Sequence, residues 1–203
     1  MKLIPMIITE MKDWFYPAEE QLLSFIGACA GEAYNSNMDK DACIKRALNC
    51  IHRGHHSVFE HANITLKCTI DRGVSHALVR HRHCAFTQSS TIYQKFQEIE
   101  VIETTATPEE TKKLYALCEL EYQRRLNSGM APGEARDVLP TCLATNLIIT
   151  TNIRQWMYMI QRRCGPGDSE KMHYWNKLIR EWFTDMYPIT LAAFDTWYEE
   201  HPL

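Results

Sequence analysis

The alternation of apolar and polar side chains in residues 62–71 (ANITLKCTID) is the feature that most constrains how this chain can fold. Ile64, Leu66, Cys68 and Ile70 fall on one side of an extended segment, which is the period of a strand with one buried face. Residues 141–151 are rich in β-branched side chains and predict a second strand. Residues 99–102 predict a short third strand. The chain is therefore expected to form a small sheet.

Helical spacing of apolar residues marks most of the remaining sequence. We predict helices over residues 19–34, 39–53, 74–83, 108–127, 131–139, 152–163 and 169–187, followed by a final amphipathic segment. The polar residues 86–96 predict a loop. A chain of 203 residues is long enough for one domain with a sizeable core, so we expect a single domain over residues 1–203. The predicted fold class is α+β, with a small central β-sheet packed by several helices.

Composition excludes several classes of protein. Hydrophobic residues make up 45% and charged residues 23% of the chain, as in ordinary globular domains. The apolar segments are far shorter than the roughly 20 residues that span a bilayer, and the first residues lack the apolar core of a signal peptide. Eight cysteines without a C-x-x-C pair favour reduced thiols over a disulfide framework or a zinc ribbon. These observations predict a cytoplasmic protein that does not enter a membrane.

The charges are distributed unevenly although the net charge is only −3. Residues 72–97 and 138–167 contain no Asp or Glu, and each of these two segments carries several arginines. Local acid-free basic segments in a mildly acidic protein favour pockets for small anions such as phosphates, and they do not predict a nucleic-acid partner.

Seven of the nine histidines lie between residues 52 and 83, in two groups separated by the first predicted strand. Three interpretations stay open. A zinc or iron site would use His55, Glu60, His61, His81, His83 and Cys84, but no H-E-x-x-H spacing supports it. The histidines could instead be turn and core residues beside a solvated arginine face. The third interpretation is phosphate and flavin binding by arginines together with the hydroxyls of Ser89, Ser90 and Thr91.

Four segments decide in favour of the third interpretation through a resemblance. Arg80-His81-Arg82 is followed by seven residues and then Ser90; upstream stands GHHSVFEH (residues 54–61), and downstream stand EARDVLP (residues 134–140) and Asn152-Ile153-Arg154. Arg163 lies eleven residues after Asn152, a step that returns to the same helical face within about 20°. In this order and spacing the motifs resemble the flavin-dependent thymidylate synthases (ThyX-type), over roughly residues 28–188.

The resemblance implies the fold of that family and a homotetramer with active sites shared between subunits. It implies FAD as cofactor, NADPH as reductant and 5,10-methylenetetrahydrofolate as carbon donor for the conversion of dUMP, a pyrimidine deoxynucleotide monophosphate, to dTMP. A viral member would act in the host cytoplasm. Residues implied to bind FAD are His55, Ser57, Arg80, His81, Arg82, Gln88, Asn152 and Arg154. Those implied to bind the nucleotide are Arg80, Ser89, Ser90, Arg136 and Arg163. Arg163 and Ser90 are the implied catalytic residues, and no metal is implied.

Four positions depart from the family pattern. Ile92 stands where the family usually has an arginine, Ala77 where glutamine is common, Gln88 where glutamate is common, and Tyr158 where asparagine is common. Replacing arginine by isoleucine removes a charge and five donors at a phosphate site. The departures keep two alternatives open: hydroxymethylation of dUMP or dCMP with the same cofactors, and a non-catalytic protein that binds flavin or nucleotide.

Overall fold

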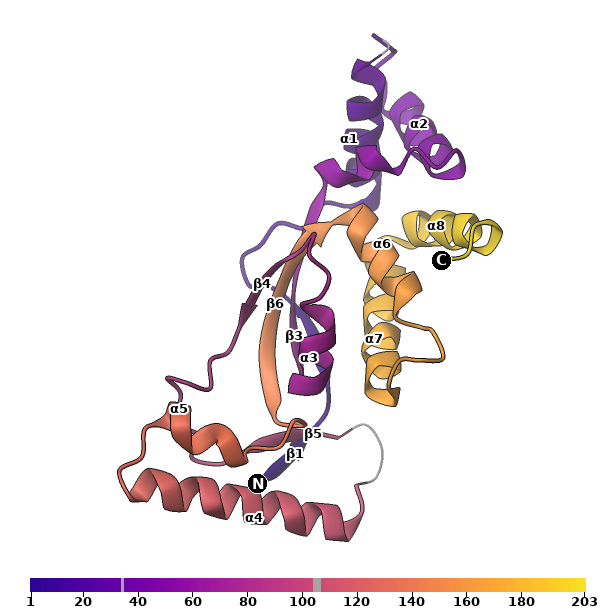
Figure 1. Cartoon of the computed structure of the whole chain (residues 1–203). Coiled ribbons are helices and arrows are strands. Elements are labelled where there is room, and N and C mark those ends of the chain that lie inside the picture. Colours follow the sequence, from indigo (N-terminus) through magenta and orange to yellow (C-terminus); the bar gives the residue numbers. More distant parts are fainter. Residues whose placement is uncertain (34, 104–106) are drawn as a thin grey trace. The chain divides into compact units, whose positions relative to one another are not determined.

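The computed structural model describes residues 1–33, 35–103 and 107–203 (Figure 1). These residues form two compact units. The first unit comprises Met1–Thr9, Lys67–His81 and Phe86–Ile149, and the second comprises Glu10–Leu66, Arg82–Ala85 and Thr150–Leu203. The single domain expected over residues 1–203 stays a prediction.

The larger sheet has at its centre the strand predicted from alternation and the strand predicted from β-branched residues. Its order is β2-β3-β6-β4, formed by β2 (Ile7–Glu10), β3 (Asn63–Asp71), β6 (Ala144–Asn152) and β4 (Ala85–Gln88). The N–H of Arg72 donates to the carbonyl of Leu143 at 3.1 Å, and the N–H of Ile153 donates to the carbonyl of Ala62 at 2.9 Å. These two bonds join opposite ends of the strands, so β3 and β6 run antiparallel. The predicted apolar face of β3 is buried along its whole length.

The first unit also contains a two-stranded parallel sheet and a long helix. β1 (Lys2–Ile4) pairs with β5 (Glu100–Ile102) in the register Lys2↔Glu100. Helix α4 (Glu109–Asn127) is followed by α5 (Pro132–Ala135) and the 3₁₀ turn η2 (Arg136–Val138). Ile99, Val101 and Leu143 form the buried apolar cluster beside this sheet. The predicted helix over 131–139 is thus a short α-helix continued by a 3₁₀ turn.

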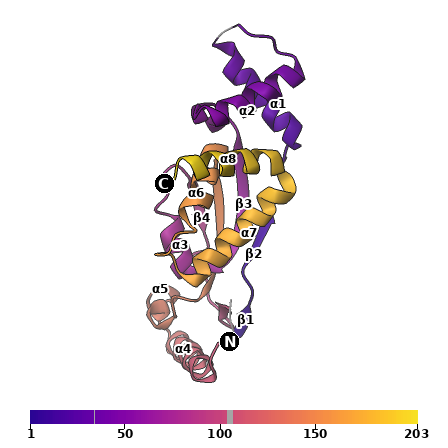
Figure 2. The same cartoon turned by 90° about the vertical axis from the view of Figure 1, so that its right-hand side faces the viewer.

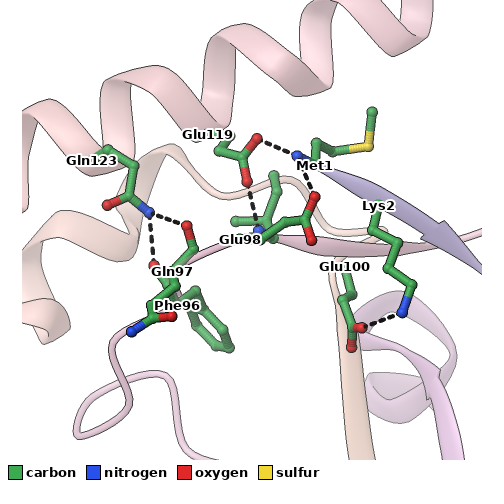
Figure 3. Close-up of polar contacts among 9 residues, drawn as sticks. Met1, Lys2, Phe96, Gln97, Glu98, Glu100, Glu119 and Gln123 are labelled. Carbon is green, nitrogen blue, oxygen red and sulfur yellow. Dashed lines mark hydrogen bonds and ion pairs between the residues drawn. The ribbon is translucent and has the colours of Figure 1, made fainter.

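Helix α4 is tied to this sheet by polar contacts (Figure 3). The Glu119 carboxylate accepts from the Met1 ammonium through one oxygen and from the Ile99 N–H at 2.7 Å through the other. One turn further along α4, the Gln123 side-chain amide donates to the Phe96 carbonyl at 2.7 Å. These contacts fix the chain that leads out of residues 89–96, a segment that belongs to the candidate site.

The second unit consists mostly of helices. It contains α1 (Glu19–Glu32), α2 (Lys40–His52), the 3₁₀ helix η1 (His56–His61), α6 (Ile153–Arg162), α7 (Glu170–Met186) and α8 (Pro188–Glu200). Figure 2 shows α8 lying against α6 and α7, in agreement with their contacts. Large aromatic side chains are fully buried here: Phe59, Trp156, Trp175, Phe183, Tyr187 and Phe194. Together with buried aliphatic side chains they form the apolar core of this unit.

Helix α3 (Arg72–Leu78) differs from the helix predicted over residues 74–83. It starts two residues earlier because the Asp71 side chain caps it by accepting the Val74 N–H at 2.7 Å. It ends earlier than predicted, and the chain beyond it is tied to β6, where the Thr151 hydroxyl donates to the His83 carbonyl at 2.6 Å. The Arg80-His81-Arg82 triplet therefore lies in a turn and not on a helix.

The loop predicted over residues 86–96 is also partly wrong, because β4 (Ala85–Gln88) pairs with the edge of β6. The side chains of this strand do not alternate between apolar and polar, so the sequence carries no strand signal there. In the structure the Gln88 amide donates to the Ser75 hydroxyl of α3 at 2.9 Å and to the Thr145 hydroxyl of β6 at 3.3 Å. Strands β1 and β2 were not predicted. The remaining helices agree with prediction to within a few residues, and Tyr34, the expected last residue of the first helix, lies outside the described residues.

No helix among the described residues is long and apolar enough to cross a lipid bilayer.

Candidate functional site

A cavity of about 300 Å³ in the first unit collects two arginines from distant parts of the sequence. It is lined by Arg72, His76, Thr91, Arg136, Asp137, Leu139, Pro140, Thr141 and Leu143. Arg72 is the first residue of α3, and Arg136 begins η2 directly after α5. One carboxylate, that of Asp137, also lines the cavity, so two guanidinium groups face one acidic side chain.

The Arg72 guanidinium is incompletely satisfied in this cavity. Its Nη1 atom is buried and has no hydrogen-bond partner among the described residues. Burial, and secondly the charge of Arg136, hold the pKa of Arg72 below its usual value. A buried donor without a partner is costly, and an anion would satisfy it with a charge-assisted bond. The geometry of this cavity therefore suits a phosphate or carboxylate group.

Arg136 lies where the family resemblance expects a nucleotide-binding residue. Its Nη1 donates to the Thr91 hydroxyl at 3.0 Å, which joins the turn after α5 to the segment that carries the two predicted serines. Arg72 was missed by the sequence analysis as a site residue. The available signal was its place in the acid-free segment 72–97, directly after a residue that caps a helix.

Ser89 and Ser90 lie in the same segment as Thr91. The Ser90 hydroxyl accepts the Ile92 N–H at 3.1 Å, and the Ser89 N–H donates to the Asn146 carbonyl at 2.9 Å. Ser89 lines a polar cavity of about 190 Å³ with Thr69, Thr91, Thr145, Asn146 and other residues. Ile92 is 47% exposed and lies close to Gly133. Its side chain is apolar, so it adds no hydrogen-bond donor to the site. Gln88, expected to bind flavin, makes internal hydrogen bonds instead of an exposed contact.

The arginine–histidine–arginine triplet offers two exposed cations. Arg80 and Arg82 are exposed, whereas His81 is buried and its backbone N–H donates to the Leu78 carbonyl at 3.0 Å. Neither Arg80 nor Arg82 makes a side-chain hydrogen bond or ion pair with another described residue. Exposed arginines of this kind suit a pyrophosphate group of a dinucleotide.

The second unit holds the rest of the predicted flavin residues. His55 and Ser57 are exposed at the start of η1, and the Asn152 side chain caps α6 by accepting the Gln155 N–H at 2.8 Å. Arg154 is exposed and pairs with the Glu60 carboxylate. The side-chain amide oxygen of Asn152 is therefore already engaged. A flavin phosphate that binds Arg154 would have to compete with the Glu60 carboxylate.

One histidine of the second group lies close to the end of the first group within the second unit. The His83 carbonyl accepts from the Thr151 hydroxyl at the end of β6. Ile153, two residues later, bonds to Ala62 directly after η1. In the described part of the chain, no group of three or more His, Cys, Asp or Glu side chains is placed to hold a metal ion.

Arg163 is the C-cap residue of α6, and its guanidinium pairs with the Asp168 carboxylate. Its N–H donates to the Met159 carbonyl at 3.0 Å, and its Nη1 lies 3.2 Å from Asp168 Oδ1. The side chains of Arg163 and Asp168 are only 16% and 12% exposed. The predicted catalytic cation is thus a mostly buried, paired guanidinium.

Comparison with known proteins gives this geometry its context. A sequence model of the thymidylate synthase complementing protein family matches residues 15–189, which is most of the chain. The chain belongs to this family. The resemblance drawn from the arginine–histidine–arginine motif is therefore confirmed.

Members of the family from distant organisms match the chain at moderate identity. A flavin-dependent thymidylate synthase of Pyrococcus furiosus is 32% identical over 145 residues, 66% of this chain and 59% of that protein. One from Synechocystis is 26% identical over 190 residues, 84% of this chain and 88% of that protein. A probable flavin-dependent thymidylate synthase of Paramecium bursaria Chlorella virus 1 is 26% identical over 167 residues, 72% of this chain and 77% of that protein.

Among solved structures, a UMP/dUMP methylase of Streptomyces cacaoi superimposes with a TM-score of 0.80 at 19% identity and covers 97% of both chains. At this identity the likeness shows the fold. The predicted α+β class with small sheets and many helices, similar to family members, is confirmed.

Proposed function

We propose that this member of the thymidylate synthase complementing protein family transfers a one-carbon unit from 5,10-methylenetetrahydrofolate to C5 of dUMP and releases dTMP. The proposed cofactor is FAD, the proposed reductant is NADPH, and the proposed location is the cytoplasm. When bound, FAD supplies the reducing equivalents that convert the transferred carbon into a methyl group. The family relatives named as flavin-dependent thymidylate synthases support this reaction.

The observation that carries the proposal is the partnerless Nη1 of Arg72 beside Arg136. We assign this cavity to the phosphate of the nucleotide. Arg136 is fixed by Thr91, so its guanidinium is oriented before the ligand arrives. Arg72 gains a partner only when an anion enters, which makes nucleotide binding favourable at this point. The two arginines also compensate for Ile92, which stands where the family usually has a cation.

The proposed flavin residues fit the group through their donors. Exposed Arg80 and Arg82 would hold the pyrophosphate, and exposed His55, Ser57 and Arg154 offer further donors to FAD. His81, Gln88 and the helix cap Asn152 already have partners in the protein, so we assign them a supporting role.

Arg163 is the proposed main catalytic residue. A guanidinium placed against the pyrimidine ring stabilises negative charge that develops there during attack by C5, and such fixed charge is often the largest catalytic contribution. Ser89 and Ser90 would orient the nucleotide through their hydroxyls. We assign Ser90 no nucleophilic role, since its oxygen accepts a backbone N–H and no general base was identified for it.

A homotetramer with shared active sites is the proposed assembly. Leu114, Leu117 and Leu120 on α4 are 56%, 61% and 67% exposed, on one side of the helix. A contiguous apolar face of this kind is typical of an interaction surface. A second copy of the chain is the partner that the family resemblance implies.

Hydroxymethylation of dUMP or dCMP is the second candidate, and Ile92 is the observation that favours it. A side chain without donors at that position changes the contacts available to the nucleotide. The carbon donor and cofactor would be unchanged.

Isothermal titration of the protein with dUMP and with deoxyuridine tests the assigned phosphate cavity. We expect deoxyuridine to bind about 100-fold or more weakly, because it lacks the group that satisfies two arginines. Equal affinity for the two ligands would remove the main support for a nucleotide monophosphate substrate.

A further inference from the structure

A short turn joins the proposed catalytic arginine to the next helix. Helix α6 ends at Arg162, Arg163 follows as its C-cap, and α7 begins at Glu170 with Ser169 as its N-cap. Between the caps lie Cys164, Gly165, Pro166, Gly167 and Asp168. The turn brings the Asp168 carboxylate back onto the guanidinium of Arg163, at 3.2 Å between Oδ1 and Nη1.

This ion pair is mostly buried. The two side chains are 16% and 12% exposed, whereas the Arg154–Glu60 pair in the same unit is about half exposed on both sides. Burying a charged pair is expensive, and replacing such a pair by apolar residues is often neutral or stabilising. A buried pair of this kind therefore needs an explanation other than stability.

Asp168 depends on Arg163 for its charge compensation. Its second oxygen, Oδ2, is buried and has no hydrogen-bond partner among the described residues. The only side chain within ion-pair distance of Asp168 among them is that of Arg163. Because solvent does not reach Oδ2, the guanidinium provides the main electrostatic support of this carboxylate.

The backbone of the turn sets the position of Asp168. The Asp168 N–H donates to the Gly165 carbonyl at 3.1 Å, and the His173 Nε2 atom lies 2.9 Å from the same carbonyl. The Ser169 hydroxyl accepts the Met172 N–H at 3.2 Å and fixes the start of α7. The backbone on both sides of Asp168 is thus fixed, and its carboxylate gives the Arg163 guanidinium a defined partner position.

We propose that Asp168 is a positioning residue for Arg163, which it holds so that the guanidinium presents a constant face to the pyrimidine ring. The inference rests on the proposed function of Arg163. An arginine side chain has many rotamers, which the contact with Asp168 restricts, and small misplacements of a catalytic group are costly in rate. Asp168 acts through Arg163 and makes no contact with substrate.

Two substitutions separate positioning from an inhibitory role of the negative charge. Asp168→Ala removes both the acceptor and the charge, whereas Asp168→Asn keeps an acceptor of the same shape and removes only the charge. Positioning predicts that Asp168→Ala lowers kcat about 10- to 100-fold and that Asp168→Asn recovers most of this loss. The KM for dUMP should change little, because the phosphate is bound in the first unit. An inhibitory carboxylate would instead make both variants faster than the wild type, which would overturn the proposal.

Asp195 provides a matched control. It pairs with Arg180 and accepts from Gln161, so Asp195→Ala also removes an acid that joins helices of the second unit. We expect Asp195→Ala to lower the melting temperature without lowering kcat after the protein is loaded with FAD. A loss of kcat in Asp195→Ala equal to that in Asp168→Ala would mean that general loosening of the unit explains both effects.

Chemical rescue covers the case in which Asp168→Ala does not fold. Arg163→Ala should regain activity when free guanidinium is added, because Asp168 would dock the cation at the vacated place. Arg163→Ala combined with Asp168→Ala, which removes the acceptor and leaves no unpaired buried charge, should be rescued much less. Equal rescue with and without the carboxylate would contradict the proposal.

Crystal structures of the wild type and the Asp168→Ala variant give a readout independent of turnover. The proposal expects one ordered guanidinium position in the wild type and a displaced or multiple one in the variant. An unchanged Arg163 in the variant would refute positioning. An ordered pair in a wild type that makes no dTMP would leave Asp168 in its role and refute the proposed function.

Discussion

Arg136 Nη1 donates to the Thr91 hydroxyl at 3.0 Å, and this bond joins two segments that lie 45 residues apart in the sequence. One segment carries the serines of the family motif, and the other carries the arginine expected on the nucleotide. The bond places both at the cavity that Arg72 lines with its partnerless Nη1. The cavity that we assign to the phosphate is therefore assembled within the first unit.

Substitution of Arg72 tests the role that only the structure revealed. Arg72→Met should weaken dUMP binding about 10- to 100-fold, because one charge-assisted bond to the phosphate is lost. Affinity for deoxyuridine should stay unchanged, and titration calorimetry measures both. Arg124→Met is the control, since Arg124 is an exposed arginine of the same unit that pairs with Glu121. Weakening of both ligands to the same extent would indicate damage to the fold and not loss of a phosphate contact.

Arg72 also shows where sequence reasoning reached its limit. The acid-free segment predicted an anion site near residues 72–97, and the motif directed attention to residue 80 and beyond. The unusual property of Arg72, a buried donor without a partner, depends on packing against η2 from 64 residues away. No local pattern reports such a contact.

The pH dependence of stability should carry a contribution from His56. This ring is buried against Phe194 and Trp197, and burial lowers its pKa below the ordinary 6.5. Below pH 6.5 the unfolded chain binds a proton there that the folded protein rejects. Stability should therefore fall as the pH drops through this window, by up to about 1.4 kcal/mol per pH unit.

Urea unfolding between pH 7.5 and about pH 5 measures this slope. His56→Phe should flatten it, whereas His52→Asn, at an exposed position on α2, should leave it in place. A slope identical in the wild type and in His56→Phe would assign the effect to other groups.

Gly27 is required for the close packing of α1 on α2. A Cβ atom there would lie 1.8 Å from the Cys43 carbonyl oxygen, and backbone cannot move aside cheaply. Gly27→Ala should destabilise the protein by about 2 kcal/mol or more in thermal or chemical unfolding, as overpacked core substitutions do. Gly167→Ala has open space around its Cβ and should change stability far less. A Gly27→Ala variant as stable as the wild type would show that the two helices separate readily.

The exposed leucines of α4 make a prediction about assembly. Leu117→Glu should lower the oligomeric state measured by sedimentation, because it places a charge in the proposed apolar interface. Glu110→Gln alters a neighbouring exposed residue of the same helix and should leave assembly unchanged. A wild-type protein that sediments as a monomer, or a Leu117→Glu variant that assembles normally, would contradict the proposed homotetramer.

The fold was predictable where local patterns decide it. The alternation in residues 62–71 gave β3, and helical spacing gave α1, α2, α4, α6 and α7 to within a few residues. β1 escaped prediction because its partner β5 lies about 100 residues away and the strand has only three residues. The helix after β3 was misplaced because a cap at Asp71 and a bond from Thr151 determine its ends.

The candidate site was predictable through motifs and not through chemistry alone. Spacing from Asn152 identified Arg163, yet nothing in the sequence marked Asp168 as its partner across a Gly-Pro-Gly turn. The motif predicts Gln88 as a flavin residue, and only the fold shows that its amide donates to Ser75 and Thr145. Motifs name residues, whereas their hydrogen-bond partners follow from the fold.

Mass spectrometry of the nucleotide product tests the central claim most directly. The protein is supplied with FAD, NADPH and methylenetetrahydrofolate, with dUMP and dCMP in separate reactions. The account predicts a product of dUMP that carries one added methyl group and is identical to dTMP, and it predicts no product from dCMP. A hydroxymethylated product, reaction with dCMP alone, or no product from an FAD-loaded protein would contradict it.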